Sequence, residues 1–111
     1  MGFFRKLFGL DKREAELVDA LQRGSYIIDV RTPMEYKEGH IQQAVNIPLE
    51  QIRDNAEKIK KMGKPVITTC QTGGRSRRAK NILRRKGIED VYNGKGWIHL
   101  REMIKIVTKS K

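Results

Sequence analysis

Cys70 is the only cysteine of the chain, and the residues after it have the composition of an anion-binding loop. Two adjacent glycines, Gly73 and Gly74, allow backbone conformations that turn several N–H groups toward one point, and a helix that starts there adds its dipole. Such donors pull the pKa of a thiol below the free value of about 8.5 because they stabilise the thiolate. The alternative is a small, buried and unreactive cysteine. The candidate site comprises the nucleophile Cys70 and a substrate-binding loop of Gln71, Thr72, Gly73, Gly74, Arg75 and Ser76.

Cations crowd the start of the segment that follows this loop. Arg75, Arg77 and Arg78 would occupy the first turn of a helix, where the helix dipole disfavours each cation by about 0.3 to 1 kcal/mol. An anion bound at the loop would explain them. The alternative for Arg77 and Arg78 is that they belong to a solvated basic face of the helix, together with Lys80, Arg84 and Arg85.

The charge of the chain is unevenly distributed. The formal net charge is +11, and residues 75–111 contribute +9 of it, with 12 basic and 3 acidic side chains. The last third of the chain is therefore where anionic partners would be drawn.

Helices and strands alternate along the chain around this loop. The apolar spacing predicts helices at about 12–22, 34–37, 49–62, 74–87 and 97–107, and strands at 26–30, 44–47, 66–70 and 91–92. Asp11 and Glu14 resemble a capping box at the start of the first of these helices. The alternation predicts an α/β fold with an open, mainly parallel sheet of four to five strands, flanked by helices on both faces. A fifth strand would recruit residues 3–10.

Ligands of open α/β sheets bind outside the carboxyl ends of the strands. This rule selects Cys70 with its loop and, at the end of the first strand, Asp29 and Arg31. These two side chains could support the site by contacting substrate, or they could form an ion pair with each other, or with Glu35 or Glu38, that holds the strand end.

A chain of 111 residues with 38% hydrophobic residues is long enough for one domain with its own core. We expect this domain to span residues 11–111, after a short apolar and basic segment at 1–10. A single cysteine excludes an internal disulfide and fits a reducing compartment. With no long apolar run and no signal peptide pattern, we expect a cytoplasmic protein. His99 has no companion ligand, so we expect no metal site.

From residue 11 to about residue 107 the sequence resembles the single-domain rhodaneses. The matching motifs are Asp29-Val30-Arg31, the segment from Glu35-Tyr36 through Gly39-His40-Ile41 to Asn46-Ile47-Pro48, and the loop Cys70-x-x-Gly73-x-Arg75-Ser76. The resemblance implies a sulfurtransferase without a cofactor. The Cys70 thiolate would attack the outer sulfur of thiosulfate or a similar donor, and the resulting persulfide would pass its sulfur to cyanide or a cellular thiol.

Loop length distinguishes this chain from relatives of similar fold. Four residues separate Cys70 from Arg75, whereas the related dual-specificity phosphatases and arsenate reductases carry five. The shorter ring suits one sulfur atom better than a tetrahedral phosphate. The chain departs from the family pattern at Lys95, which separates two glycines that are commonly adjacent. We expect His40 to be a buried, hydrogen-bonded structural residue and Trp97 to belong to the core.

One reading competes with an enzyme, a non-catalytic basic module that binds RNA or an acidic protein through residues 75–111. No aromatic residues are interleaved with the charges of residues 75–86 for base stacking, so nucleic-acid binding has little support. A further reading, membrane contact through the stripe from Phe3 to Phe8, could coexist with catalysis, and the stripe could instead dock on the core. An activated thiol has no use in a pure binding module, so we favour the enzyme, acting as a monomer.

Overall fold

The structure is a computed structural model that describes residues 9–109. Its elements are, in chain order, α2 (Lys12–Gln22), β1 (Tyr26–Asp29), α3 (Pro33–Glu38), β2 (Val45–Asn46), the 3-10 helix η1 (Leu49–Gln51), α4 (Ile52–Lys61), β3 (Val66–Cys70), α5 (Gly74–Arg85), β4 (Val91–Gly96) and α6 (Trp97–Lys109). The four strands form one sheet in the order β2-β1-β3-β4, with every pairing parallel. The predicted parallel α/β sheet is therefore confirmed. The stripe from Phe3 to Phe8 lies outside the described residues.

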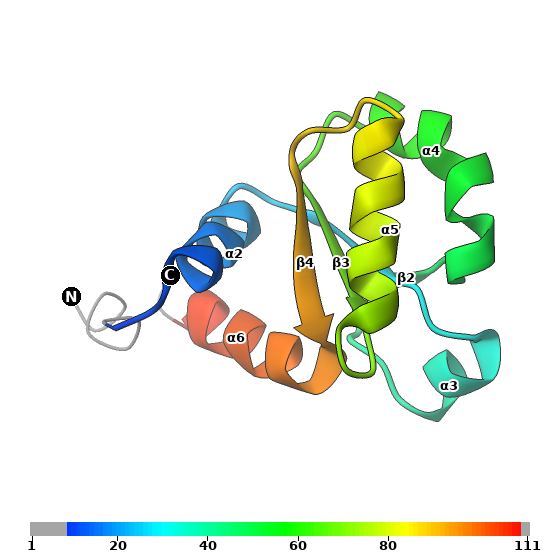
Figure 1. The fold of residues 1–111 in the computed structure, drawn as a ribbon. Helices are drawn as coiled ribbons and strands as arrows, with labels where there is room; N and C mark the ends of the chain where they lie inside the picture. The colour runs from blue at the N-terminus through cyan, green and yellow to red at the C-terminus, as the bar shows by residue number, and fades with distance from the viewer. Residues whose placement is uncertain (1–8, 110–111) are drawn as a thin grey trace.

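Helices cover both faces of the sheet. In Figure 1, α4 and α5 lie on one side of the sheet, and α2 and α6 lie on the other. Ile28 packs in the cluster that includes α4 and α5, whereas the preceding residue, Ile27, packs in the cluster that includes α2 and α6. Successive side chains of a strand point to opposite faces, so a strand that is covered on both sides buries consecutive residues. This is why β1 and β3 begin with consecutive apolar residues, Tyr26-Ile27-Ile28 and Val66-Ile67, before the buried polar residues at their carboxyl ends.

Two capping boxes fix where helices begin. The Asp11 side chain accepts a hydrogen bond from the Glu14 N–H (2.8 Å), and the Glu14 carboxylate accepts one from the Asp11 N–H (3.3 Å). Thr32 and Glu35 form the same arrangement at the start of α3. Each box satisfies two backbone donors that a helix start leaves without partners. The helix predicted over 49–62 is instead divided into η1 and α4.

Strand β4 is longer than the two residues that the sequence predicts. It continues through Asn93, Gly94 and Gly96, and Cys70 pairs with Gly96. These glycines do not form a turn but let β4 pack closely against its neighbours. A Cβ on Gly94 would lie 2.8 Å from the Ile67 side chain. A Cβ on Gly96 would lie 2.9 Å from the Gln71 carbonyl oxygen. Glycine in a strand often marks such a contact, and here the contact brings β4 against the Cys70 loop.

No helix within residues 9–109 is both long and apolar enough to cross a bilayer.

Candidate functional site

Cys70 is the last residue of β3, and only residues 71–73 separate it from the first residue of α5. The chain turns this tightly because Gly73 has a φ of +113°, a left-handed conformation that favours glycine. Figure 1 shows the loop at the end of the sheet to which the strands point. Cys70 is buried with 1% of its surface exposed, whereas Gln71 and Thr72 are exposed. The sulfur therefore lies at the bottom of the loop, beneath two solvent-facing residues.

Hydrogen-bonding groups of the loop surround the Cys70 sulfur. The Gly73 N–H donates to Sγ at 3.0 Å and the Ser76 N–H at 3.4 Å, while the thiol itself donates to the Ser76 hydroxyl oxygen, 3.4 Å away. Burial raises the pKa of the thiol, but hydrogen bonds from the Ser76 hydroxyl and from backbone N–H groups of Ser76, Gly73 and Thr72 outweigh it. The pKa of Cys70 is thus lowered, because these donors favour the thiolate. The loop thus directs several N–H groups at one sulfur atom.

Asn93 on β4 belongs to this cluster, and the sequence analysis missed it. The Ser76 hydroxyl lies 2.6 Å from Asn93 Oδ1 and 3.1 Å from the Gly73 carbonyl. The Lys95 N–H donates to the same Asn93 oxygen (2.9 Å). Asn93 could have been recognised as a site residue, because polar residues at the carboxyl ends of parallel strands lie close together. It was not recognised, because β4 was predicted to end at residue 92.

Arg75 forms an ion pair with a residue of another helix. Its guanidinium donates to both carboxylate oxygens of Glu35 on α3, at 2.7 and 3.0 Å. This pairing lowers the pKa of Glu35 to about 2, chiefly through the hydrogen bond from Arg75. The Arg75 side chain stays about one third exposed, so Arg75 is fixed beside the loop while part of it faces solvent.

Asp29 and Arg31 form a buried ion pair with each other. Arg31 donates to both Asp29 oxygens at 2.7 to 3.1 Å, and both side chains are at most 3% exposed. Arg31 also donates to the Gly39 carbonyl (2.7 Å) and lies 4.9 Å above the ring of Trp97. The sequence left open whether these side chains contact substrate or form an ion pair. The observed contacts are those of an ion pair that holds the end of β1. Trp97 is partly buried and packs against the core, as expected.

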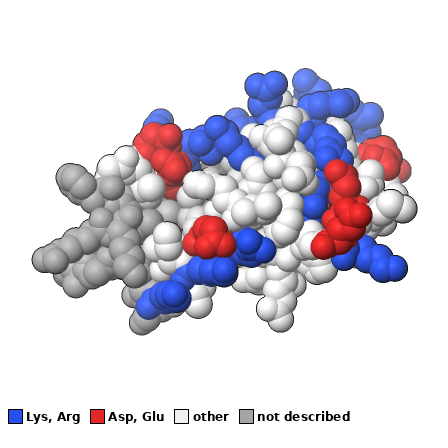
Figure 2. Space-filling view, turned by 90° about the horizontal axis from the view of Figure 1, so that it is seen from below, with Lys and Arg blue, Asp and Glu red and all other residues white. Residues whose placement is uncertain are grey.

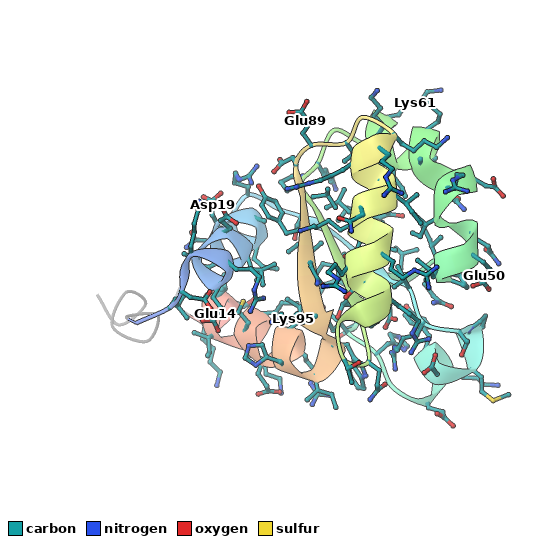
Figure 3. All side chains as sticks on the ribbon, in the orientation of Figure 1. Glu14, Asp19, Glu50, Lys61, Glu89 and Lys95 are labelled. Carbon is teal, nitrogen blue, oxygen red and sulfur yellow. The ribbon has the colours of Figure 1, made fainter. Side chains whose placement is uncertain are left out.

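Lys95 lies at the rim of the loop, near the carboxyl end of β4 (Figure 3). Its backbone has a φ of +60°, which is unusual for a residue other than glycine. Its carbonyl accepts a hydrogen bond from Thr69 Oγ1 (2.7 Å), and its Cγ would lie 3.3 Å from a Cβ on Gly73. The lysine that interrupts the glycine pair is therefore packed against the turn of the Cys70 loop.

The two histidines lie away from the thiol cluster. His40 is exposed, so the prediction that it is buried was wrong; it stacks on the Tyr36 ring at 3.7 Å and bonds the Tyr36 carbonyl. Its contacts are with Tyr36 on α3, a helix that itself buries no residue. His99 is exposed, 3.9 Å from Glu14. Within residues 9–109, no cluster of side chains has the composition of a metal site.

The cations after the loop form an exposed basic face on α5. Arg77, Arg78, Arg84 and Arg85 are all exposed and form no ion pair with a carboxylate of residues 9–109. Lys80 is half-buried among them: its pKa is lowered by burial first and by the charges of Arg84 and other arginines next. Figure 2, which views the molecule from below Figure 1, shows Lys and Arg gathered along its upper edge.

The arrangement can stabilise an anion at one point. A thiolate would sit among N–H and O–H donors, and Arg75 would supply positive charge beside it. Such a group can attack an electrophilic atom and hold the negative charge when it leaves again.

Comparison with known proteins agrees with this geometry. A model of the rhodanese-like domain matches residues 14–98. The uncharacterised protein YqhL of Bacillus subtilis is 45% identical over 74 residues, which cover 67% of this chain and 58% of that protein. Thiosulfate sulfurtransferase PspE of Escherichia coli is 37% identical over 70 residues, which cover 62% of this chain and 67% of PspE.

Two further similarities mark the range of proteins that contain this fold. A tRNA uridine(34) hydroxylase of Cytophaga hutchinsonii is 40% identical over 76 residues, which cover 65% of this chain and 24% of the hydroxylase. The solved structure of a rhodanese with anions from E. coli superposes with a TM-score of 0.62 at 34% identity, over 68% of this chain and 89% of that one. The chain thus spans less than two thirds of YqhL and about a quarter of the hydroxylase.

Proposed function

Since the chain belongs to the rhodanese-like family, we propose that it is a sulfurtransferase that carries a sulfane sulfur on Cys70. The observation that carries the proposal is the position of Sγ, buried at the end of β3 with the N–H groups of Gly73 and Ser76 directed at it. The named activity of PspE supports it. The hydroxylase supports it less, because three quarters of that relative has no counterpart in the matched region.

The proposed reaction has two steps. In the first, the Cys70 thiolate attacks the outer sulfur of thiosulfate, the sulfur–sulfur bond of the donor breaks, and sulfite leaves with the bonding electrons. Cys70 then carries a persulfide. In the second, a cellular thiolate, or cyanide in an assay, attacks the outer sulfur and the Cys70 thiolate leaves. No proton and no redox partner is required from the protein, which fits a site that surrounds the sulfur with hydrogen-bond donors.

Each part of the loop has a role in this proposal. The N–H groups of Gly73 and Ser76 and the Ser76 hydroxyl stabilise the thiolate before attack and after release. Gln71, Thr72 and Gly74 form the wall of the loop. Arg75, held by Glu35, presents positive charge to an anionic donor. Asp29 and Arg31 support the end of β1 from below. We propose a cytoplasmic protein whose acceptor is a thiol of the cell.

An intact mass measurement tests the proposal. Incubation with thiosulfate should leave the protein heavier by one sulfur atom, and cyanide should restore the original mass. The Cys70→Ser variant is the matched control and should show neither change. A folded wild-type protein that gains no sulfur from thiosulfate or from other sulfane donors would contradict the proposal. That result would favour the alternative, a non-catalytic module that binds an anionic partner through its basic face.

A further inference from the structure

The Ser76 hydroxyl has one proton and three neighbours that could accept it. Asn93 Oδ1 is the nearest at 2.6 Å, the Gly73 carbonyl follows at 3.1 Å, and the Cys70 sulfur is the most distant at 3.4 Å. The Gly73 carbonyl already accepts the helical hydrogen bond from the Arg77 N–H (3.1 Å). A hydroxyl donates to only one acceptor at full strength, so the three contacts compete for one proton.

The backbone of Lys95 fixes the orientation of the Asn93 amide. A backbone N–H can only donate, and the Lys95 N–H lies 2.9 Å from the side-chain atom that also faces Ser76. That atom must therefore be the amide oxygen, and it cannot donate to Ser76. The contact between Asn93 and Ser76 must use the Ser76 proton. The Ser76 oxygen then faces Cys70 with lone pairs, ready to accept the S–H of a neutral thiol.

We propose that Asn93 is a positioning residue that holds the Ser76 hydroxyl proton away from the Cys70 sulfur, so that the hydroxyl serves the thiolate only after it turns from Asn93. The proposal rests on the proposed role of Cys70 as the nucleophile. When Cys70 ionises, the hydroxyl must break its 2.6 Å contact in order to donate to sulfur. In a persulfide the Sγ atom carries no charge, and the hydroxyl can stay on Asn93. Asn93 therefore favours the sulfur-loaded form over the free thiolate.

Charged groups also lie on the elements around the loop, and the charge of Arg75 interacts with Cys70. They are Arg75 paired with Glu35 on α3, Arg31 paired with Asp29 at the end of β1, and Lys95 on β4. Replacement of Asn93 by an uncharged residue changes none of these charges. If the substitution of Asn93 changes the pKa of the Cys70 thiol only when Ser76 has its hydroxyl, the change is due to competition for the Ser76 proton.

The test is the pH dependence of Cys70 alkylation by iodoacetamide in a double-mutant cycle. Asn93→Leu removes the competing acceptor and should lower the pKa of Cys70 by roughly half a unit to one unit, the equivalent of one hydrogen bond. In the Ser76→Ala background the same substitution should leave the pKa unchanged. An unchanged or raised pKa in the wild-type background would overturn the proposal, as would an equal shift in both backgrounds.

A second variant covers a failure of the first to fold. Asn93→Ala is smaller and is carried through the same cycle, with circular dichroism to confirm the fold of each protein. Alkylation needs no sulfur donor, so its result is separate from the sulfur-transfer assay. A protein that gains sulfur but shows no coupling between Asn93 and Ser76 refutes only the positioning role. One that shows the coupling but gains no sulfur refutes only the proposed function.

Discussion

Arg75 and Glu35 are 40 residues apart in the chain, and two hydrogen bonds of 2.7 and 3.0 Å join them beside the Cys70 loop. The pair links the first turn of α5 to α3. It holds a planar guanidinium in a fixed orientation while one third of that side chain remains open to solvent. An anion that approaches the thiol thus meets a cation that is already in place, which reduces the ordering that binding requires.

Substitution of Arg75 should separate charge from geometry. Arg75→Lys keeps the charge but cannot bond both Glu35 oxygens from one plane, so kcat/KM for thiosulfate should fall roughly ten-fold or more. Arg75→Ala should lose more activity and should also raise the pKa of Cys70, because the charges of these two residues interact. Steady-state kinetics and alkylation over a pH series measure the two effects. A wild-type rate and an unchanged alkylation profile in Arg75→Ala would show that Arg75 has no part in the site.

The ion pair of the Glu35 carboxylate with Arg75 should stabilise the fold at neutral pH and should lose this effect in acid. The folded-state pKa of about 2 lies below the ordinary value of 4.5, so the pair stabilises the protein fully above pH 4.5, and this contribution is lost as the pH falls toward 2. Glu35→Gln keeps an acceptor for the capping box and should cost no more than about 1 kcal/mol at neutral pH, since the pair is partly exposed. Urea unfolding at several pH values measures this. Glu38→Gln on the same helix is the control, and a pH-independent cost for Glu35→Gln would contradict the prediction.

The basic face of α5 should steer anionic donors toward the loop. Rising salt should increase the KM for thiosulfate more than it lowers kcat, because screening over about 8 to 10 Å weakens the encounter. Charge reversal of Arg77 and Arg78 should have the same effect as salt. Reversal of Lys58 and Lys61 on α4 is the matched control, since Lys61 lies near the top of the view in Figure 3, away from Lys95 at the rim of the loop. A KM that does not respond to salt would mean that these arginines serve another partner.

The buried ion pair of Asp29 and Arg31 should contribute to the stability of the fold rather than to substrate binding. Arg31→Ala leaves the Asp29 carboxylate buried without its partner and should destabilise the fold by about 3 to 5 kcal/mol. A double variant, Asp29→Asn with Arg31→Met, removes both charges and should cost less. Urea unfolding of the three proteins gives the comparison. Normal stability of Arg31→Ala together with a loss of thiosulfate activity would instead assign Arg31 to substrate binding.

Local signals in the sequence predicted most of the fold. The capping box at Asp11 and the stop near Gly24 bracket α2, and the apolar run before Cys70 identifies β3. The end of β4 could not be predicted in this way, because Gly94 and Gly96 resemble a turn until the contacts with β3 and the loop are known. A strand end that depends on close approach to distant backbone has no local signature.

The site was only partly predictable for the same reason. The Cys70 loop is contiguous, so its glycines and arginine could be interpreted together. Glu35 and Asn93 reach the loop from other elements, across 40 and 17 residues from their respective partners, Arg75 and Ser76. A single sequence records which side chains exist but not which of them meet. The surface position of His40, stacked on Tyr36 of α3, is likewise a matter of packing that the sequence does not record.

The burial of Cys70 sets different size limits for the two molecules that the proposed reaction brings together. With 1% of the residue exposed, its sulfur offers almost no surface to an approaching reagent. Once loaded, the transferable sulfur would stand one sulfur–sulfur bond, about 2 Å, beyond Sγ and closer to the mouth of the loop. The donor would therefore have to be small, whereas the acceptor thiol could belong to a much bulkier molecule, including another protein.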